Sequence, residues 1–106
     1  GKPEVTGGTL PDPSIIGDAI RRRLAAIRAC YEAALRLDDR VAGKIVVLFT
    51  ITKTGAVVAG EIESNTTHDA ALGACVLRRL RGFRFPALKD GPLTVGYPFI
   101  FAPAKK

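Results

Sequence analysis

The chain has 106 residues, of which 47% are hydrophobic and 25% are charged. This length and composition exclude a disordered chain and predict one globular domain with its own hydrophobic core. The formal net charge of +6 favours acidic partners such as nucleic acid, anionic lipid or an acidic polymer. No apolar stretch approaches the roughly 20 residues needed to cross a bilayer, so any membrane anchor is expected outside these residues.

The N-terminal part of the chain predicts a tail followed by a helix. Residues 1–13 are rich in Gly, Pro and Thr and show no apolar period, which predicts a linker tail. In residues 15–37, apolar side chains recur three or four positions apart with arginines between them. This spacing predicts one amphipathic helix of about 20 residues.

The hydrophobic period then changes from that of a helix to that of a strand. Residues 44–51 alternate with a period of two, which places on one face Ile45, Val47, Phe49 and Ile51 and leaves the other face less polar than that of a fully exposed strand. Residues 52–55 form a predicted turn in which Gly55 needs a positive φ. Residues 56–63 are a second extended segment, which should pair back antiparallel with the first. The two segments therefore predict a β-hairpin.

The C-terminal part predicts a second helix and a closing strand. The helix extends from His68 to about Gly82, residues 93–101 alternate again, and residues 104–106 form a short tail. Pro98 cannot donate a ladder hydrogen bond, so the strand should present an edge or a bulge there. The order α-β-β-α-β predicts an α+β domain at residues 14–103, in which two helices cover one face of a three-stranded antiparallel sheet and the other face is partly open.

Several segments of the chain carry a resemblance to a known family. They are Arg-Ala-Cys-Tyr-Glu-Ala-Ala-Leu at residues 28–35, Gly-Lys-Ile-Val-Val-Leu-Phe-Thr-Ile at 43–51 followed by Gly-Ala-Val at 55–57, Ala-Cys-Val at 74–76, Phe-Arg-Phe-Pro at 83–86 and Tyr-Pro-Phe-Ile-Phe at 97–101. In this order they resemble the TonB C-terminal domain, and more closely the AgmX/PglI C-terminal branch of myxobacterial gliding-motility proteins (Glt machinery type). The resemblance covers about residues 15–103.

The resemblance implies a periplasmic domain of an inner-membrane-anchored protein, which couples a proton-driven motor to outer-envelope partners in gliding motility or transport. It implies binding rather than catalysis, and a weak homodimer is also compatible with it. In TonB-like domains the last strand is an open edge that pairs with an extended segment of an outer-membrane or periplasmic partner. Here that edge comprises Leu93, Thr94, Val95, Gly96, Tyr97, Pro98, Phe99, Ile100 and Phe101. Proline at Val95 is therefore expected to abolish partner binding and to leave the fold mostly intact.

The two cysteines, Cys30 and Cys75, lie on helix faces that should meet over the sheet. A disulfide between the two helices and a pair of buried free thiols are both compatible with this placement. The disulfide is favoured chiefly because the resemblance implies an oxidising periplasm.

Other candidate sites are weaker. The cysteines lack zinc-ligand spacing, His68 has no evident triad partner, and Glu61 with Glu63 is more typical of a solubilising strand face, so no catalytic residue, metal or cofactor is expected. A basic patch of Arg78, Arg79 and Arg81 leaves one alternative function, a small basic nucleic-acid-binding domain. Against it, the sequence shows no helix-turn-helix spacing and no aromatic pair on adjacent strands.

Overall fold

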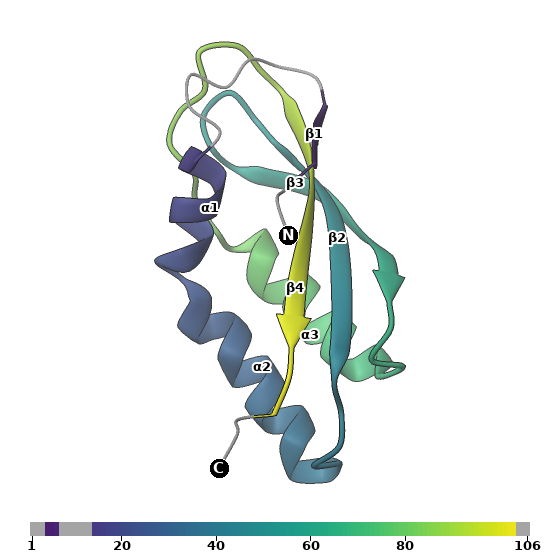
Figure 1. Ribbon diagram of the computed structural model, residues 1–106. Helices are drawn as coiled ribbons and strands as arrows, with labels where there is room; N and C mark the ends of the chain where they lie inside the picture. Colours follow the sequence, from purple (N-terminus) through teal and green to yellow (C-terminus); the bar gives the residue numbers. More distant parts are fainter. Residues whose placement is uncertain (1–3, 7–13, 104–106) are drawn as a thin grey trace.

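The computed structural model describes residues 4–6 and 14–103. Over these residues it contains a mixed sequence of helices and strands: β1 (Glu4–Thr6), α1 (Ser14–Arg21), α2 (Leu24–Leu37), β2 (Gly43–Ile51), β3 (Val57–Asn65), α3 (Ala70–Arg81) and β4 (Leu93–Phe101). The strands form one antiparallel sheet in the order β1-β4-β2-β3, with the helices beside it (Figure 1). The prediction of an α+β domain with an antiparallel sheet is confirmed.

The long helix predicted for residues 15–37 is two helices, so the predicted number of helices is wrong. The chain leaves helical geometry at Arg23, which has φ −118° and ψ 17°. Its amide donates to the carbonyl oxygen of Ile20, three residues back, which closes a tight turn between α1 and α2. Ile20 and Ile27 are both buried on either side of the turn, whereas Leu24 remains 36% exposed.

A second difference concerns the segment predicted as a linker. Residues 4–6 form β1, which pairs with residues 94–96 of β4. Over the described residues the sheet therefore has four strands rather than three. The prediction for the rest of residues 1–13, and for residues 104–106, lies outside the described residues.

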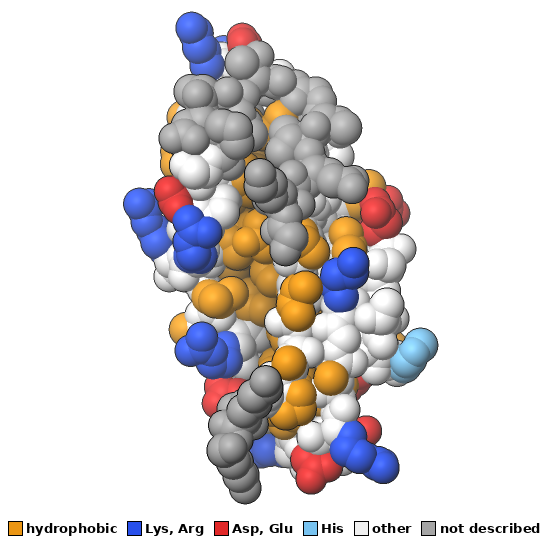
Figure 2. Space-filling view, in the orientation of Figure 1, with side chains coloured by type: hydrophobic (Ala, Val, Ile, Leu, Met, Phe, Trp, Pro, Cys, Tyr) orange, Lys and Arg blue, Asp and Glu red, His pale blue; other side chains and the backbone are white. Residues whose placement is uncertain are grey.

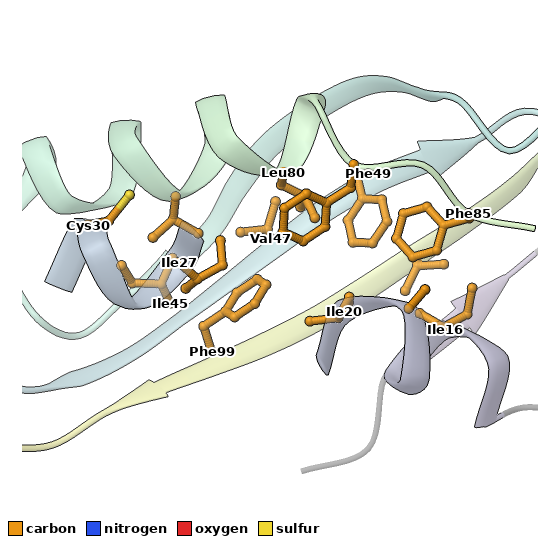
Figure 3. Packing of buried hydrophobic residues seen from close by; sticks show 14 of the residues in the cluster. Ile16, Ile20, Ile27, Cys30, Ile45, Val47, Phe49, Leu80, Phe85 and Phe99 are labelled. Atoms are coloured by element: carbon orange, nitrogen blue, oxygen red, sulfur yellow. The ribbon is translucent and has the colours of Figure 1, made fainter. Parts of the chain in front are cut away.

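The core lies between the sheet and the helices. Alternate residues of β2 point into it, and Ile45, Val47, Phe49 and Ile51 are at most 1% exposed. Side chains from α1, α2 and α3 join the same cluster, as Figure 3 shows for the region around Phe49. On the other face of β2, Val46 and Leu48 are only partly buried, in agreement with the predicted partly open face.

Gly55 allows the β2–β3 turn to contact the segment that follows α3. Its φ is +92°, which confirms the predicted positive value, and its carbonyl oxygen accepts a 2.9 Å hydrogen bond from the amide of Phe85. A Cβ atom at this position would overlap the carbonyl oxygen of Phe85. The close approach therefore requires glycine.

Candidate functional site

Cys30 of α2 and Cys75 of α3 form a disulfide, with 5.8 Å between their Cα atoms. The predicted pairing is confirmed, and the alternative of two free thiols is wrong. Cys30 is buried, and Cys75 is half-buried. The bond joins α2 to α3 and so holds α2 in place above the sheet.

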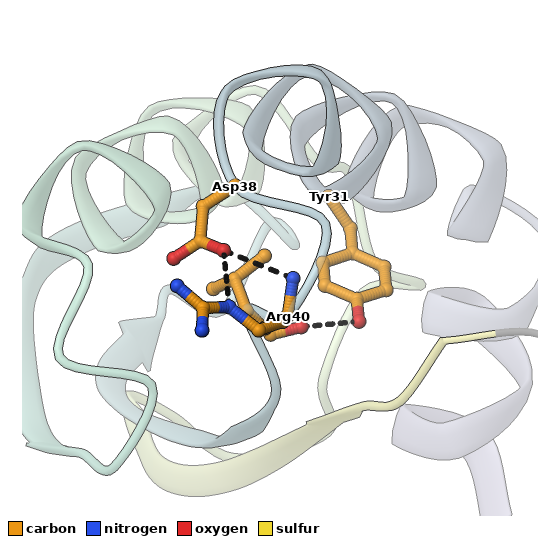
Figure 4. Close-up of polar contacts among 4 residues, drawn as sticks. Tyr31, Asp38 and Arg40 are labelled. Carbon is orange, nitrogen blue, oxygen red and sulfur yellow. Dashed lines mark hydrogen bonds and ion pairs between the residues drawn. The ribbon is translucent and has the colours of Figure 1, made fainter.

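A second contact fixes the other side of α2. The hydroxyl of Tyr31 donates a 2.6 Å hydrogen bond to the carbonyl oxygen of Val41, in the loop before β2 (Figure 4). The ring of Tyr31 lies 5.0 Å from that of Phe101, between ring centroids. Burial raises the pKa of the Tyr31 hydroxyl. In the same loop, the Asp38 carboxylate accepts a 3.0 Å hydrogen bond from the amide of Arg40.

The direction of the backbone groups along β4 follows from β2, its neighbour. The carbonyl oxygen of Lys44 accepts from Thr66 on the β3 side of β2. Because backbone groups alternate in direction along a strand, those of Ile45 face β4 and engage Phe99, its partner in the register. The same alternation directs the backbone groups of Pro98 and Ile100 away from β2, toward the edge of the sheet.

The missing amide of Pro98 is therefore compatible with a regular sheet. The pairing of β2 with β4 runs from Gly43 opposite Phe101 to Ile51 opposite Leu93 without a register shift. Of the two alternatives predicted for Pro98, an edge or a bulge, this geometry corresponds to an edge. Proline is found on edge strands for this reason.

The edge of β4 has two halves. Residues 94–96 pair with β1, whereas no strand within the described residues pairs with residues 97–101 on this side. In this free half, the outward backbone groups are the carbonyl of Pro98 and both the amide and the carbonyl of Ile100. The edge expected at residues 93–101 is therefore covered at its N-terminal half, and its C-terminal half has no partner strand in the part of the chain that the structure describes.

The structure argues against the expectation that proline at Val95 would leave the fold mostly intact. Val95 is fully buried, and it lies opposite Phe49 in the pairing with β2. The alternation of β4 directs the Val95 amide toward β2, so proline would remove an internal ladder hydrogen bond and disturb the core. Ile100 is the better position, because its amide faces outward and its side chain is 66% exposed.

An apolar groove lies beside the free half of β4. It has a volume of about 350 Å³ and is lined by Leu24, Ile27, Arg28 and Tyr31 of α2 and by residues 97–102 of β4 and the following position. Figure 2 shows hydrophobic side chains gathered in a band on this face, with Lys and Arg side chains around them. The motifs did not reveal this groove, because α2 and β4 are far apart in the sequence.

The opposite edge of the sheet, β3, is irregular. Its pairing with β2 has two register shifts, and Ala59, beside one of them, has a positive φ of 48°. The guanidinium of Arg81 donates a 3.3 Å hydrogen bond to the carbonyl oxygen of Gly60. Bulges and exposed charges such as Glu61 and Glu63 protect sheet edges from pairing. The β3 edge is therefore less suited to adding a strand than the free half of β4.

The predicted basic patch lies at the C-terminal end of α3. Arg78, Arg79 and Arg81 are all exposed, and Arg81 is the one that contacts β3. His68 is exposed and precedes α3, whose first turn is capped by the Asp69 carboxylate accepting from the amide of Leu72. The described residues contain no group of three His, Cys, Asp or Glu residues placed to hold a metal ion. Among the same residues, no helix is long and apolar enough to cross a membrane.

Together these features define a class: an α+β domain with a disulfide between two helices and a half-covered sheet edge beside an apolar groove. No family model matches the chain, and neither a curated protein nor a solved structure matches it.

Proposed function

We propose that this chain is a periplasmic protein-interaction domain of an inner-membrane-anchored, TonB-like transducer. It couples a proton-driven motor to an outer-membrane or periplasmic partner, in gliding motility or transport, and it binds that partner by strand pairing. After β1, the elements follow the α-β-β-α-β order of the TonB C-terminal resemblance once α1 and α2 are counted as one interrupted helix. Its function is binding, with no catalytic step.

The free half of the β4 edge is the observation that carries this proposal. There the amide and carbonyl of Ile100 and the carbonyl of Pro98 face outward beside an apolar groove. Soluble proteins usually cover or disrupt such edges, as this chain does at β3 and at residues 94–96 of β4. An edge left available next to apolar side chains favours the addition of a partner strand.

The disulfide supports the proposed compartment. Disulfides persist in oxidising environments such as the bacterial periplasm and are rare in the reducing cytosol. The bond between Cys30 and Cys75 joins two helices, α2 and α3, rather than exposed loops. This arrangement is typical of a structural disulfide in an exported domain.

Strand pairing can be tested by removing the outward-facing amide of Ile100. A library of random nine-residue peptides displayed on phage is selected against the oxidised domain, and the affinity of an enriched peptide is then measured for Ile100→Pro and Ile100→Thr. Ile100→Pro removes the amide that a partner strand needs, whereas Ile100→Thr removes only the apolar side chain. We expect a loss of at least about tenfold in affinity for Ile100→Pro beyond that for Ile100→Thr, which corresponds to about 1.4 kcal/mol.

Two results would contradict strand pairing. One is a selected peptide that binds Ile100→Pro as tightly as Ile100→Thr. The other is a selection that enriches no peptide at all. Circular dichroism and a thermal unfolding curve for each variant establish that it is folded before its affinity is compared.

A second candidate function, nucleic-acid binding, is favoured by the exposed arginines at the end of α3. Reversing Arg78 and Arg79 to glutamate tests it without disturbing Arg81, which contacts Gly60. If the patch binds phosphates, a mobility shift with DNA or RNA is lost in the variant and weakens steeply with salt in the wild type. Absence of a shift at low salt would eliminate this candidate.

A further inference from the structure

We infer that the groove between α2 and β4 selects an extended polypeptide segment with apolar side chains at alternate positions and a carboxylate that reaches Arg28. This inference rests on the proposed function, and it adds the chemistry of the partner. It concerns the side chains of the partner, whereas the proposed function concerns its backbone.

The side chains that line the groove indicate that the partner segment carries apolar side chains. Ile27 and Phe99 are buried at its base, and Tyr31 and Tyr97 line it from opposite elements. Leu24 is one of four exposed large hydrophobic side chains in the described part of the structure, and it lines this groove from α2. Apolar side chains of a partner would remove this surface from water.

The backbone beside the groove requires the occupant to be a polypeptide. The outward amide and carbonyl of Ile100 need an acceptor and a donor, which an extended chain supplies together. Successive side chains of such a strand point to opposite faces of the sheet. Every second side chain would therefore enter the groove against α2, and the others would face the opposite side of the sheet. A lipid acyl chain would fill the apolar space and leave the backbone groups of Ile100 without partners.

The position of Arg28 indicates that the partner segment also carries a carboxylate. This side chain is exposed, lines the groove from α2, and makes no ion pair with any residue in the described part of the chain. By contrast, the nearby Arg21 is paired with Asp18. A guanidinium at the rim of an apolar groove favours a carboxylate, which it can bind through two parallel hydrogen bonds. No acidic side chain lines the groove itself.

The experiment reverses the charge at the rim. The random nine-residue library is selected in parallel against the wild-type domain, Arg28→Glu and Arg79→Glu. Arg79 is also an exposed arginine, lies on α3 and does not line the groove, so it is the matched control. We expect Asp or Glu at one position of alternating apolar peptides from the wild type and from Arg79→Glu, and Lys or Arg at that position from Arg28→Glu. The best wild-type peptide should bind Arg28→Glu about tenfold more weakly.

The outcomes separate this inference from the proposed function. Enriched apolar peptides that need the Ile100 amide but are unaffected by Arg28→Glu would overturn the inference and leave strand pairing in place. Peptides that bind Arg28→Glu more weakly than the wild type, but bind Ile100→Pro as tightly as Ile100→Thr, would support recognition of side chains by the groove and contradict strand pairing. Displacement of bound peptide by vesicles of phosphatidylglycerol, in a manner lost in Arg28→Glu, would overturn the inference in favour of a lipid site.

Discussion

Tyr31 and Val41 are joined by a hydrogen bond from the tyrosine hydroxyl to the valine carbonyl oxygen, 2.6 Å long and buried. It ties the middle of α2 to the loop that leads into β2. At the preceding position of the same helix, the disulfide of Cys30 joins α2 to α3. The Cys-Tyr pair of the resemblance motif therefore holds α2 from two sides, and this positions one wall of the groove. Nothing in the structure explains the exposed Glu32 that follows.

Replacing Tyr31 with phenylalanine tests the hydrogen bond alone, because the ring and its contact with Phe101 are retained. The buried carbonyl oxygen of Val41 would lose its side-chain donor. We expect the free energy of unfolding to fall by about 1 to 2 kcal/mol, as measured by urea denaturation of the oxidised protein. An unchanged midpoint would show that the bond contributes nothing to stability.

The raised pKa of Tyr31 predicts a loss of stability in alkali. Its hydroxyl holds a proton in the folded state at pH values where the unfolded chain, with an ordinary tyrosine pKa of about 10, has begun to release it. Because the unfolded state then binds fewer protons, the contribution of this group is full below about pH 10 and is lost as the pH rises through the folded pKa. The difference in unfolding free energy between the wild type and Tyr31→Phe should therefore shrink above pH 10. A difference that stays constant to pH 11 would contradict this.

Removing the disulfide should destabilise the domain strongly. For a sequence separation of 45 residues, the loop-entropy relation gives about 4 kcal/mol at 25 °C. The Cys30→Ala/Cys75→Ala variant should unfold at a much lower urea concentration than the oxidised wild type. The reduced wild type should resemble it, and the mass of the folded oxidised protein should not change on treatment with a thiol-alkylating reagent. Two alkylated thiols in a folded monomer would contradict the pairing.

Replacing Gly55 with alanine should destabilise the turn that meets Phe85. Alanine is unfavourable at a φ of +92°, and its Cβ atom would overlap the Phe85 carbonyl oxygen. We expect a loss of at least about 2 kcal/mol in unfolding free energy. Gly82→Ala is a suitable control, because Gly82 has a φ of −89° and a Cβ there would meet only an ordinary contact. Equal losses in both variants would show that the contact with Phe85 is not the cause.

Weakening β1 should make a longer part of the β4 edge available to a partner. Thr6 lies opposite Thr94, whose backbone groups face β1, so Thr6→Pro removes an amide from this pairing. Val5→Pro is the control, because alternation directs the Val5 amide away from β4. We expect a selected peptide to bind Thr6→Pro several-fold more tightly than Val5→Pro. Equal affinities would show that β1 does not compete with the partner.

The sequence by itself determined which residues form the core of the sheet. Period-two alternation in residues 44–51 predicts the buried set Ile45, Val47, Phe49 and Ile51, because each side chain direction in a strand follows from its position. The glycine of the β2–β3 turn was predictable for a similar local reason. The disulfide could not be predicted in the same way, because it requires two helices to meet. The resemblance to the TonB C-terminal domain favoured it more than the positions of the cysteines did.

The tertiary structure alone decided what is available for binding. Helical spacing continues through residues 22–23, so the pattern did not reveal the turn that separates α1 from α2. Likewise, residues 4–6 carry no alternation long enough to predict a strand, and β1 exists because β4 offers it an edge. The groove combines α2 with β4, which only folding brings together. The hydrophobic period of a segment indicates which of its residues are buried. Free sheet edges and grooves depend instead on which segments, distant in the sequence, become neighbours in the fold.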